Sequence, residues 1–194
     1  MRSSLLVFVV AVLVLAGTSA QAQSWIPVGA PGGNVRALAF DPRDPQRVYL
    51  GTTDGILYRS DNGGLLWRRL GPGFPLSGCS LDEIVVDPRG VVFVGYREVH
   101  GSGGGVARST DGGQTLVVLK DVEGQSVRAL AVAPSDPQVI AAGTLTGVFV
   151  SSDGGQRWAR ITPKGCRATL VNPENADRNT NFSHMSRSMV SLSK

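Results

Sequence analysis

The sequence predicts an all-β fold, a β-propeller of four-stranded antiparallel blades that is partial, with about three blades plus the start of a fourth. The first observation is an eight-residue phrase, Ser-x-Asp-x-Gly-x-x-Trp, which occurs at Ser60–Trp67, Ser109–Leu116 and Ser151–Trp158. The second is a strand-like segment that ends in proline, at 35–42, 81–88 and 127–134, with successive prolines 46 residues apart. Repeats of about 40 to 50 residues with short strands are typical of propeller blades.

Each copy of the phrase is expected to close a β-hairpin. The Asp side chain accepts backbone N–H bonds within the turn, and the Gly two residues later supplies a positive φ. The final Trp begins the next strand and presents a flat surface to a neighbouring sheet. In the first copy Asn62 keeps the carbonyl acceptor, and in the second Leu116 replaces Trp and is expected to weaken packing. This structural role is assigned to Ser60, Asn62, Gly64, Trp67, Ser109, Asp111, Gly113, Ser151, Asp153, Gly155 and Trp158.

Each repeat divides into four predicted strands. In the first blade they cover 35–40, 47–51, 55–59 and 66–70. In the second they cover 81–86, 91–96, 105–109 and 115–119, and in the third 127–132, 138–143, 147–151 and 157–162. Several of these strands are continuous apolar runs, as expected where a sheet is packed on both faces.

The two ends of the chain extend the repeat. The segment 25–29 resembles 67–71, which predicts a fourth strand that precedes the first blade. The segment 168–178 resembles 37–47, so a fourth blade begins there, whereas 179–194 is rich in Ser and shows no strand alternation. Closed propellers need at least four blades. We therefore expect an incomplete ring over 23–178 and a disordered tail over 179–194.

The first 22 residues are typical of a secretory signal peptide. Arg2 is followed by an apolar run over 5–16 and by a small-residue cleavage pattern that ends at Ala22. We expect a secreted or periplasmic protein with no membrane span in the mature chain. The net charge is only +4 and the arginines are scattered, which argues against a nucleic-acid partner.

Two cysteines in an exported chain raise the possibility of a disulfide. Cys79 and Cys166 precede equivalent prolines and are placed in similar loops of blades 2 and 4. Loops two blades apart should lie beyond the ~7 Å Cα separation that a disulfide allows. We expect both thiols to be free.

The phrases at 51–67 and 143–158 resemble those of the Asp-box (BNR) repeat proteins, and this resemblance covers residues 25 to 178. They are most similar to the sortilin-type receptor propellers, to the photosystem II assembly-factor propellers and to exported bacterial proteins of this class. The resemblance implies a propeller in which the Asp box is structural and lies away from the ligand face. It does not imply an activity, because one fold carries many functions.

The binding face is predicted from unequal loops. The loops between strands 2 and 3 differ in length, because three residues separate Gly51 from Gly55 but nine separate Gly95 from Gly105. Insertions confined to one face often mark a binding face. The candidate binding residues are Asp54, Arg97, Glu98 and His100.

Two carboxylates could instead support glycoside hydrolysis. The segment around Asp54 is similar to the Asp-bearing segment of propeller endoxyloglucanases, although Asp-Gly is also a common turn dipeptide. Asp82 and Glu83 could supply the second carboxylate, but such a pair beside a strand is usually a solvated edge. The catalytic set of the sialidases in this family, an Arg triad, a Tyr–Glu pair and an Asp, has no match here.

Other candidate sites are weaker. His100 has no His or Cys partner at ligand spacing, so no metal site and no cofactor are predicted. Arg36 and Arg128 occupy equivalent positions in blades 1 and 3. In the photosystem relatives a ring of arginines contributes to partner binding, and a plain charged strand edge is the simpler alternative.

The sequence therefore favours an exported binding or scaffold module that recognises a protein or glycan partner. One alternative is a sialidase-like or xyloglucanase-like glycoside hydrolase with part of its catalytic set missing. Another is a non-functional gene fragment. The sequence makes no prediction of the oligomeric state.

Overall fold

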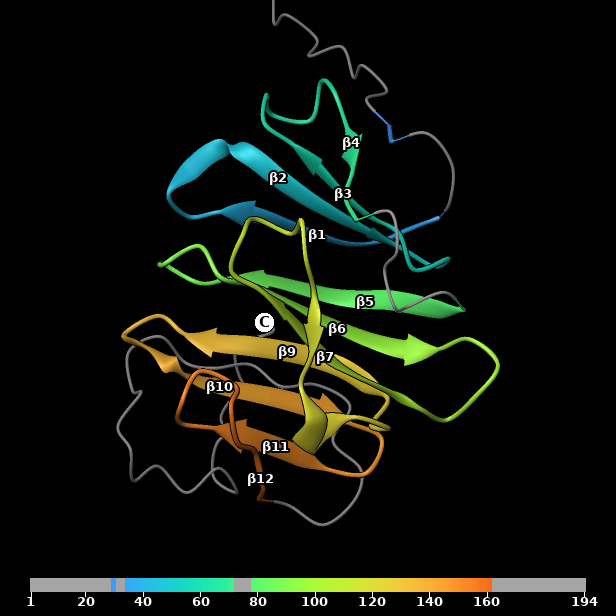
Figure 1. The fold of residues 1–194 in the computed structure, drawn as a ribbon, viewed down its shortest axis with the longest axis vertical. Coiled ribbons are helices and arrows are strands. Elements are labelled where there is room, and N and C mark those ends of the chain that lie inside the picture. Colours follow the sequence, from blue (N-terminus) through green and yellow to red (C-terminus); the bar gives the residue numbers. More distant parts are fainter. Residues whose placement is uncertain (1–28, 31–33, 72–77, 162–194) are drawn as a thin grey trace, which may run out of the picture.

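Three four-stranded antiparallel sheets lie side by side in the computed structural model, which describes residues 29–30, 34–71 and 78–161 (Figure 1). Blade 1 contains β1 (Val35–Asp41), β2 (Asp44–Thr52), β3 (Leu57–Ser60) and β4 (Arg68–Arg69). Blade 2 contains β5 (Cys79–Val86), β6 (Val92–Glu98), β7 (Gly104–Ser109) and β8 (Val117–Val118), followed by the short 3-10 helix η1 (Lys120–Val122). Blade 3 contains β9 (Val127–Ala133), β10 (Asp136–Thr144), β11 (Val148–Ser151) and β12 (Ala159–Arg160).

Within each sheet the spatial order of strands follows their order in the chain, so the predicted all-β blade pattern is confirmed. The outermost strands β4, β8 and β12 are shorter than predicted, with two residues each. The expected strand 25–29, the leader and the predicted start of a fourth blade lie outside the described residues, apart from Gly29, which belongs to no strand. They stay predictions.

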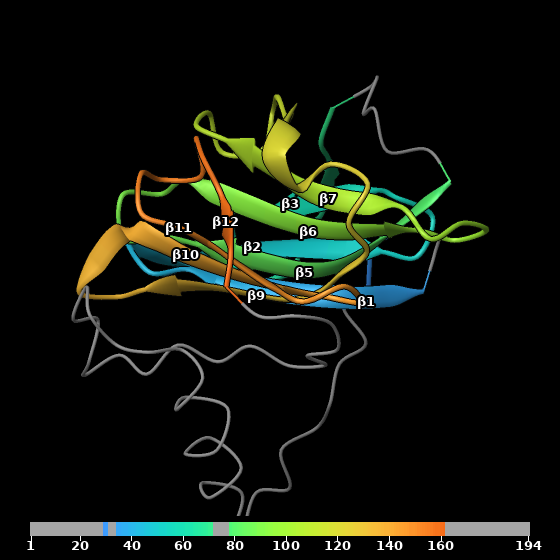
Figure 2. The same ribbon diagram turned by 90° about the horizontal axis from the view of Figure 1, so that it is seen from below.

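The first strands of successive blades are neighbours. β5 contacts β1 on one side and β9 on the other, and Figure 2 shows these three strands along one side of the stack. One apolar core fills the space between blades 1 and 2, with Tyr49 and Leu81 among its fully buried side chains. A second core, centred on Phe93 and Val127, joins blades 2 and 3.

Glycines in the second strands allow the blades to approach closely. A Cβ on Gly51 would lie 2.9 Å from the Cβ of Leu81 in the next blade. A Cβ on Gly95 would lie 2.7 Å from Cγ1 of Val127. The missing side chain of each glycine therefore leaves room for the first strand of the following blade to pack closely.

The Asp boxes form the predicted turns. The serine Oγ of each box accepts the N–H of the glycine four residues later at 2.8 Å, in all three copies. Gly64, Gly113 and Gly155 have positive φ, as predicted. Asn62 Oδ1 accepts the N–H of Leu66 at 2.8 Å, so the amide replaces the carboxylate in the first copy.

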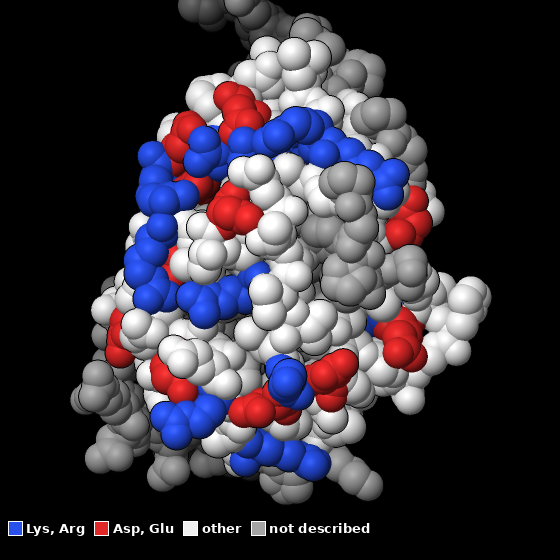
Figure 3. All heavy atoms as spheres, viewed as in Figure 1, with Lys and Arg blue, Asp and Glu red and all other residues white. Residues whose placement is uncertain are grey.

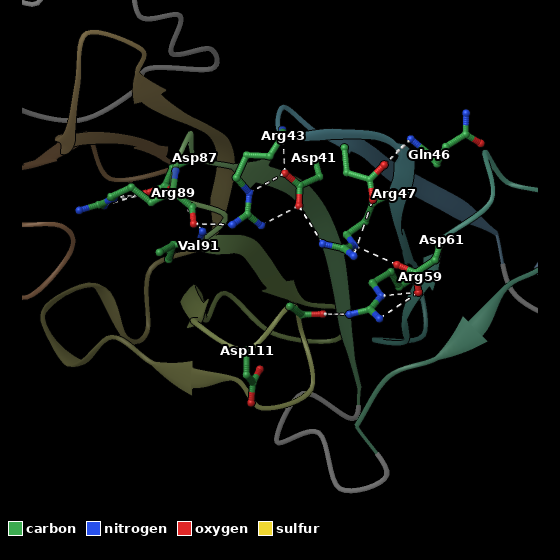
Figure 4. Close-up of polar contacts among 12 residues, drawn as sticks. Asp41, Arg43, Gln46, Arg47, Arg59, Asp61, Asp87, Arg89, Val91 and Asp111 are labelled. Carbon is green, nitrogen blue, oxygen red and sulfur yellow. Dashed lines mark hydrogen bonds and ion pairs between the residues drawn. The ribbon is translucent and has the colours of Figure 1, made fainter.

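Arginines tie the turns between the first and second strands of successive blades together (Figure 4). Arg43, held by Asp41 at 2.8 Å, donates from Nη1 to the carbonyl of Arg89 in blade 2 at 2.7 Å. Arg89, held by Asp87 at 2.6 Å, donates in turn to the carbonyl of Pro137 in blade 3 at 3.1 Å. We call these two contacts, from Arg43 and from Arg89, the arginine relay. Blade 3 has Ala133-Pro-Ser at this turn and no arginine, so the relay ends there.

Among the described residues, no helix is long and apolar enough to cross a bilayer.

The sequence predicts a loop position for Cys79 from its distance to the following proline. The structure corrects this, because Cys79 is the first residue of β5 and carries a free, buried thiol. Burial raises the pKa of this thiol. Cys166 lies outside the described residues.

Candidate functional site

The two ends of the blades differ in character. The Asp boxes and the arginine relay lie at one end, and the starts of β1, β5 and β9 lie at the other, beside the loops that join second to third strands. On the outer side of the blades, basic and acidic side chains are interspersed (Figure 3).

Three arginines converge on one carboxylate at the end opposite the Asp boxes. Arg36 on β1 donates from Nε to Asp82 Oδ1 on β5 at 3.3 Å, and Arg97 on β6 donates from Nε to Oδ2 at 2.7 Å. Nη1 of Arg128, on β9, lies 3.6 Å from Oδ2. We call Arg36, Arg97 and Arg128 the arginine cluster; it joins all three blades.

A repeated backbone irregularity places these side chains. The pairing register shifts around Arg36, Asp82 and Arg128, each the second residue of the repeated segment. An extra residue in one strand of a pair re-aims its side chain. Because β1, β5 and β9 are neighbours, the three shifted positions meet at one end of the stack.

The cluster has more positive charge and more donors than Asp82 can satisfy. The Asp82 side chain is only 5% exposed and also accepts a hydrogen bond from Ser80 Oγ at 2.5 Å. Three guanidinium groups therefore share one carboxylate. Arg36 is half exposed, and the buried Nε of Arg128 has no hydrogen-bond partner among the described residues.

Glu83 lies next to Asp82 and is partly buried. Burial and the negative charge of Asp82 raise the pKa of Glu83, against a smaller opposing effect of Arg36. Glu83 is therefore neutralised at a higher pH than an ordinary glutamate. The positive charge of this end increases as Glu83 takes up its proton.

Of the four candidate binding residues, only Arg97 joins the cluster, and it does so beside Arg36 and Arg128, whose equivalent positions the sequence had shown. Asp54 and His100 are exposed in the loops β2–β3 and β6–β7, and the structure describes no ion pair or hydrogen bond from either to the cluster. Glu98 ends β6, and its carboxylate lies over Gly101 and Gly103.

Two interpretations of the sequence were wrong. Arg97 and Glu98 belong to strand β6 rather than to an inserted loop, because Arg97 pairs with Gly104 and the Glu98 N–H bonds to the carbonyl of Gly103 at 3.0 Å. Asp82 is not a solvated edge, because its carboxylate is buried among arginines. The one sequence signal for it was its alignment with Arg36 and Arg128.

Among the described residues, no group of three His, Cys, Asp or Glu side chains could hold a metal ion.

Glycoside hydrolysis needs a second carboxylate besides Asp54, and the contacts of Asp82 limit its use in that role. Asp82 is held by Ser80 and the arginine cluster, so it is poorly suited to act as a base.

Comparison with known proteins identifies the architecture. No protein-family model matches the chain. A xyloglucanase from Paenibacillus sp. is 30% identical over 189 residues, which cover 72% of this chain and 18% of that protein. The chain spans a fifth or less of the length of the curated relatives that it matches.

Comparison with solved structures also finds xyloglucanases among the similar proteins. A GH74 xyloglucanase from Xanthomonas campestris matches with a TM-score of 0.55 and 24% identity, over 68% of this chain and 24% of that chain. YCF48 from Cyanidioschyzon merolae matches with a TM-score of 0.52 and 17% identity, over 71% of this chain and 42% of that chain. The described sheets are therefore β-propeller blades, similar in fold to those of a GH74 xyloglucanase and of YCF48.

Proposed function

We propose that the chain is an exported binding module whose arginine cluster binds carboxylate groups of an acidic partner. The observation that carries this proposal is the convergence of Arg36, Arg97 and Arg128 on the single carboxylate of Asp82. Among the residues that the structure describes, Asp82 is the one acid in direct contact with these three positive charges.

The chemistry of arginine explains why a carboxylate is the expected ligand. A guanidinium group offers several donors in one plane and binds carboxylates through two parallel hydrogen bonds. Asp82 engages Arg36 and Arg97 through Nε, and within the described part of the chain no hydrogen bond occupies their terminal nitrogens, so these can bind a ligand. Asp82 thus aligns the arginines before a partner arrives, which lowers the entropic cost of binding.

The test is fluorescence anisotropy of the full chain with two labelled probes, a Glu-rich peptide and an oligogalacturonate, each beside a neutral analogue. The variant Arg36→Gln with Arg128→Gln keeps the Arg97–Asp82 pair at 2.7 Å. We expect it to bind the acidic probe at least tenfold more weakly. The control Arg68→Gln with Arg69→Gln removes the same charge from the exposed strand β4 and should change affinity less than threefold.

The two probes separate a protein partner from a glycan partner. Binding of the peptide alone indicates an acidic protein, and binding of the oligogalacturonate alone indicates an acidic glycan. The proposal is wrong if neither probe binds above its neutral analogue, or if the cluster variant binds as the wild type does.

A second candidate function is hydrolysis of a xyloglucan-type glycan. The observation in its favour is that Asp54, in the segment similar to endoxyloglucanases, is exposed at the same end as the cluster. Release of reducing sugar from xyloglucan oligosaccharides by the full chain, lost in Asp54→Asn, would support it. No release at any pH between 4 and 7 would exclude it for this chain.

A further inference from the structure

The Asp-box turn of blade 1 carries two adjacent leucines that lie outside the core. Leu65 and Leu66 are 68% and 74% exposed, more than any other large hydrophobic side chain among the described residues. They lie in the turn between β3 and β4, at the top of the stack in Figure 1, and the partly buried Trp67 follows them. Exposure of two neighbouring leucines to water is unfavourable, so the pair needs an explanation.

The other two boxes have polar residues at these positions, and their side chains support the turn. In blade 2 Thr115 Oγ1 donates to a carboxylate oxygen of Asp111 at 2.6 Å. In blade 3 the side chain of Gln156 donates to the carbonyl of Asp153 at 3.2 Å. A leucine side chain can make no such hydrogen bond. Support of the turn therefore does not explain the leucine pair of blade 1.

Two arginines follow the leucines on the outermost strand of blade 1. Arg68 and Arg69 are exposed, whereas the equivalent strands β8 and β12 have Val-Val and Ala-Arg. The structure describes no ion pair from either guanidinium group to another described residue. Asp61, in the same turn, is already paired with Arg47 and with Arg59 at 2.9 Å each. The leucine pair therefore lies beside two positive charges that are available to a ligand.

We propose that this turn docks the molecule onto an anionic lipid surface. Apolar side chains at the tip of the turn would enter the boundary between headgroups and acyl chains, and neighbouring arginines would bind the negative headgroups. The long apolar stem of an arginine allows its charged end to stay at headgroup level. A lipid surface is favoured over a protein partner because it accepts protruding leucines without a matching groove.

The lipid contact is separate from the arginine cluster. The box turn follows the end of β3 at Ser60, which pairs with Val48, whereas the cluster surrounds Asp82 at the opposite end of the blades. A molecule docked by its leucine pair would hold the cluster away from the lipid, where an acidic partner can reach it. Neither contact requires the other.

Co-sedimentation with lipid vesicles tests the proposal. The chain from Gln23 onward is used, since the expected leader has an apolar segment of its own; this chain keeps every described residue. We expect it to bind vesicles of equal parts phosphatidylglycerol and phosphatidylcholine at least tenfold more tightly than vesicles of phosphatidylcholine alone. High NaCl should weaken this binding, and Arg68→Gln with Arg69→Gln should weaken it at least fivefold.

The leucine pair is tested with residues that the fold already accepts at this place. Leu65→Gln with Leu66→Thr installs the pair that blade 2 has between Gly113 and Leu116, so the turn should form. This variant should bind the anionic vesicles at least tenfold more weakly. The control, Val117→Thr with Leu145→Gln, changes two other apolar side chains that are 64% and 52% exposed, and it should bind as the wild type does.

Brominated lipids locate the contact. Bromine on the acyl chains should quench tryptophan fluorescence of the wild type, and Trp67→Phe should lose this quenching while Trp158→Phe keeps it. The variant Arg36→Gln with Arg128→Gln should still bind vesicles, so this result and the binding of acidic probes fail independently. Equal binding by the Gln-Thr variant would overturn the proposal. Absence of vesicle binding by the wild type would also overturn it and would assign the leucine pair to a protein contact.

Discussion

A single hydroxyl group organises each Asp-box turn. Ser60, Ser109 and Ser151 are buried, and each accepts the N–H of a glycine at 2.8 Å while donating to the Asn or Asp two residues later. The sequence predicted the acidic acceptor and the positive φ of the glycine, since both follow from turn chemistry. It did not predict the central role of serine, because a hydroxyl can bond to many local groups.

Acid should weaken two of the three boxes. Hydrogen bonds from Thr115 lower the pKa of Asp111 to about 2, and the backbone N–H of Arg157 is the largest of several causes that lower the pKa of Asp153 to about 2. A lowered pKa gives stability that is present above the pKa of the unfolded chain, near 4, and is lost as the pH falls toward 2. The box with Asn62 contributes no such dependence.

The double variant Asp111→Asn with Asp153→Asn should therefore show a flatter pH dependence of stability between pH 4 and pH 2. Urea unfolding followed by circular dichroism at several pH values measures it. Asn62 shows that an amide can hold the turn, so the variant should fold. An unchanged dependence on pH would show that these carboxylates do not govern acid stability.

The strand repeat sets the spacing between blades. The central strands could be predicted from their apolar runs and from the period of 46 residues. The register shifts at Arg36, Asp82 and Arg128 could not, because a bulge depends on how two strands pair and not on one strand alone. The same shifts bring the arginine cluster together, so the sequence raised each of the three arginines as a candidate but did not predict that they meet at Asp82.

Gly95→Ala should destabilise the protein. Its Cβ would lie 2.7 Å from Cγ1 of Val127, a fully buried and stiff side chain. Overpacking of this kind costs about 1–3 kcal/mol. Gly29→Ala is the control, since among the described residues no atom beyond its two chain neighbours lies within 4 Å of the added Cβ. Thermal melting compares the two, and equal melting temperatures would show that blades 2 and 3 can move apart at little cost.

At the scale of the whole molecule, the residues that hold the blades together and the residues proposed to bind a partner lie at opposite ends of the described blades. Ion pairs and box turns hold the blades together at one end, where Arg43 and Arg89 cross between them. At the other end, the carboxylate of Asp82 forms ion pairs with all three arginines of the cluster. The sequence predicted which end carries the variable loops, because strand order determines where each loop emerges. Which residues meet there depends on neighbouring blades, so it required the structure.

The most direct measurement is NMR of the arginine Nε–Hε groups of the full chain, titrated with an acidic peptide. The account predicts that the signals of Arg36, Arg97 and Arg128 shift together and saturate, while those of Arg43 and Arg89 at the opposite end stay in place. Shifts of equal size at both ends, or shifts confined to Arg43 and Arg89, would contradict it.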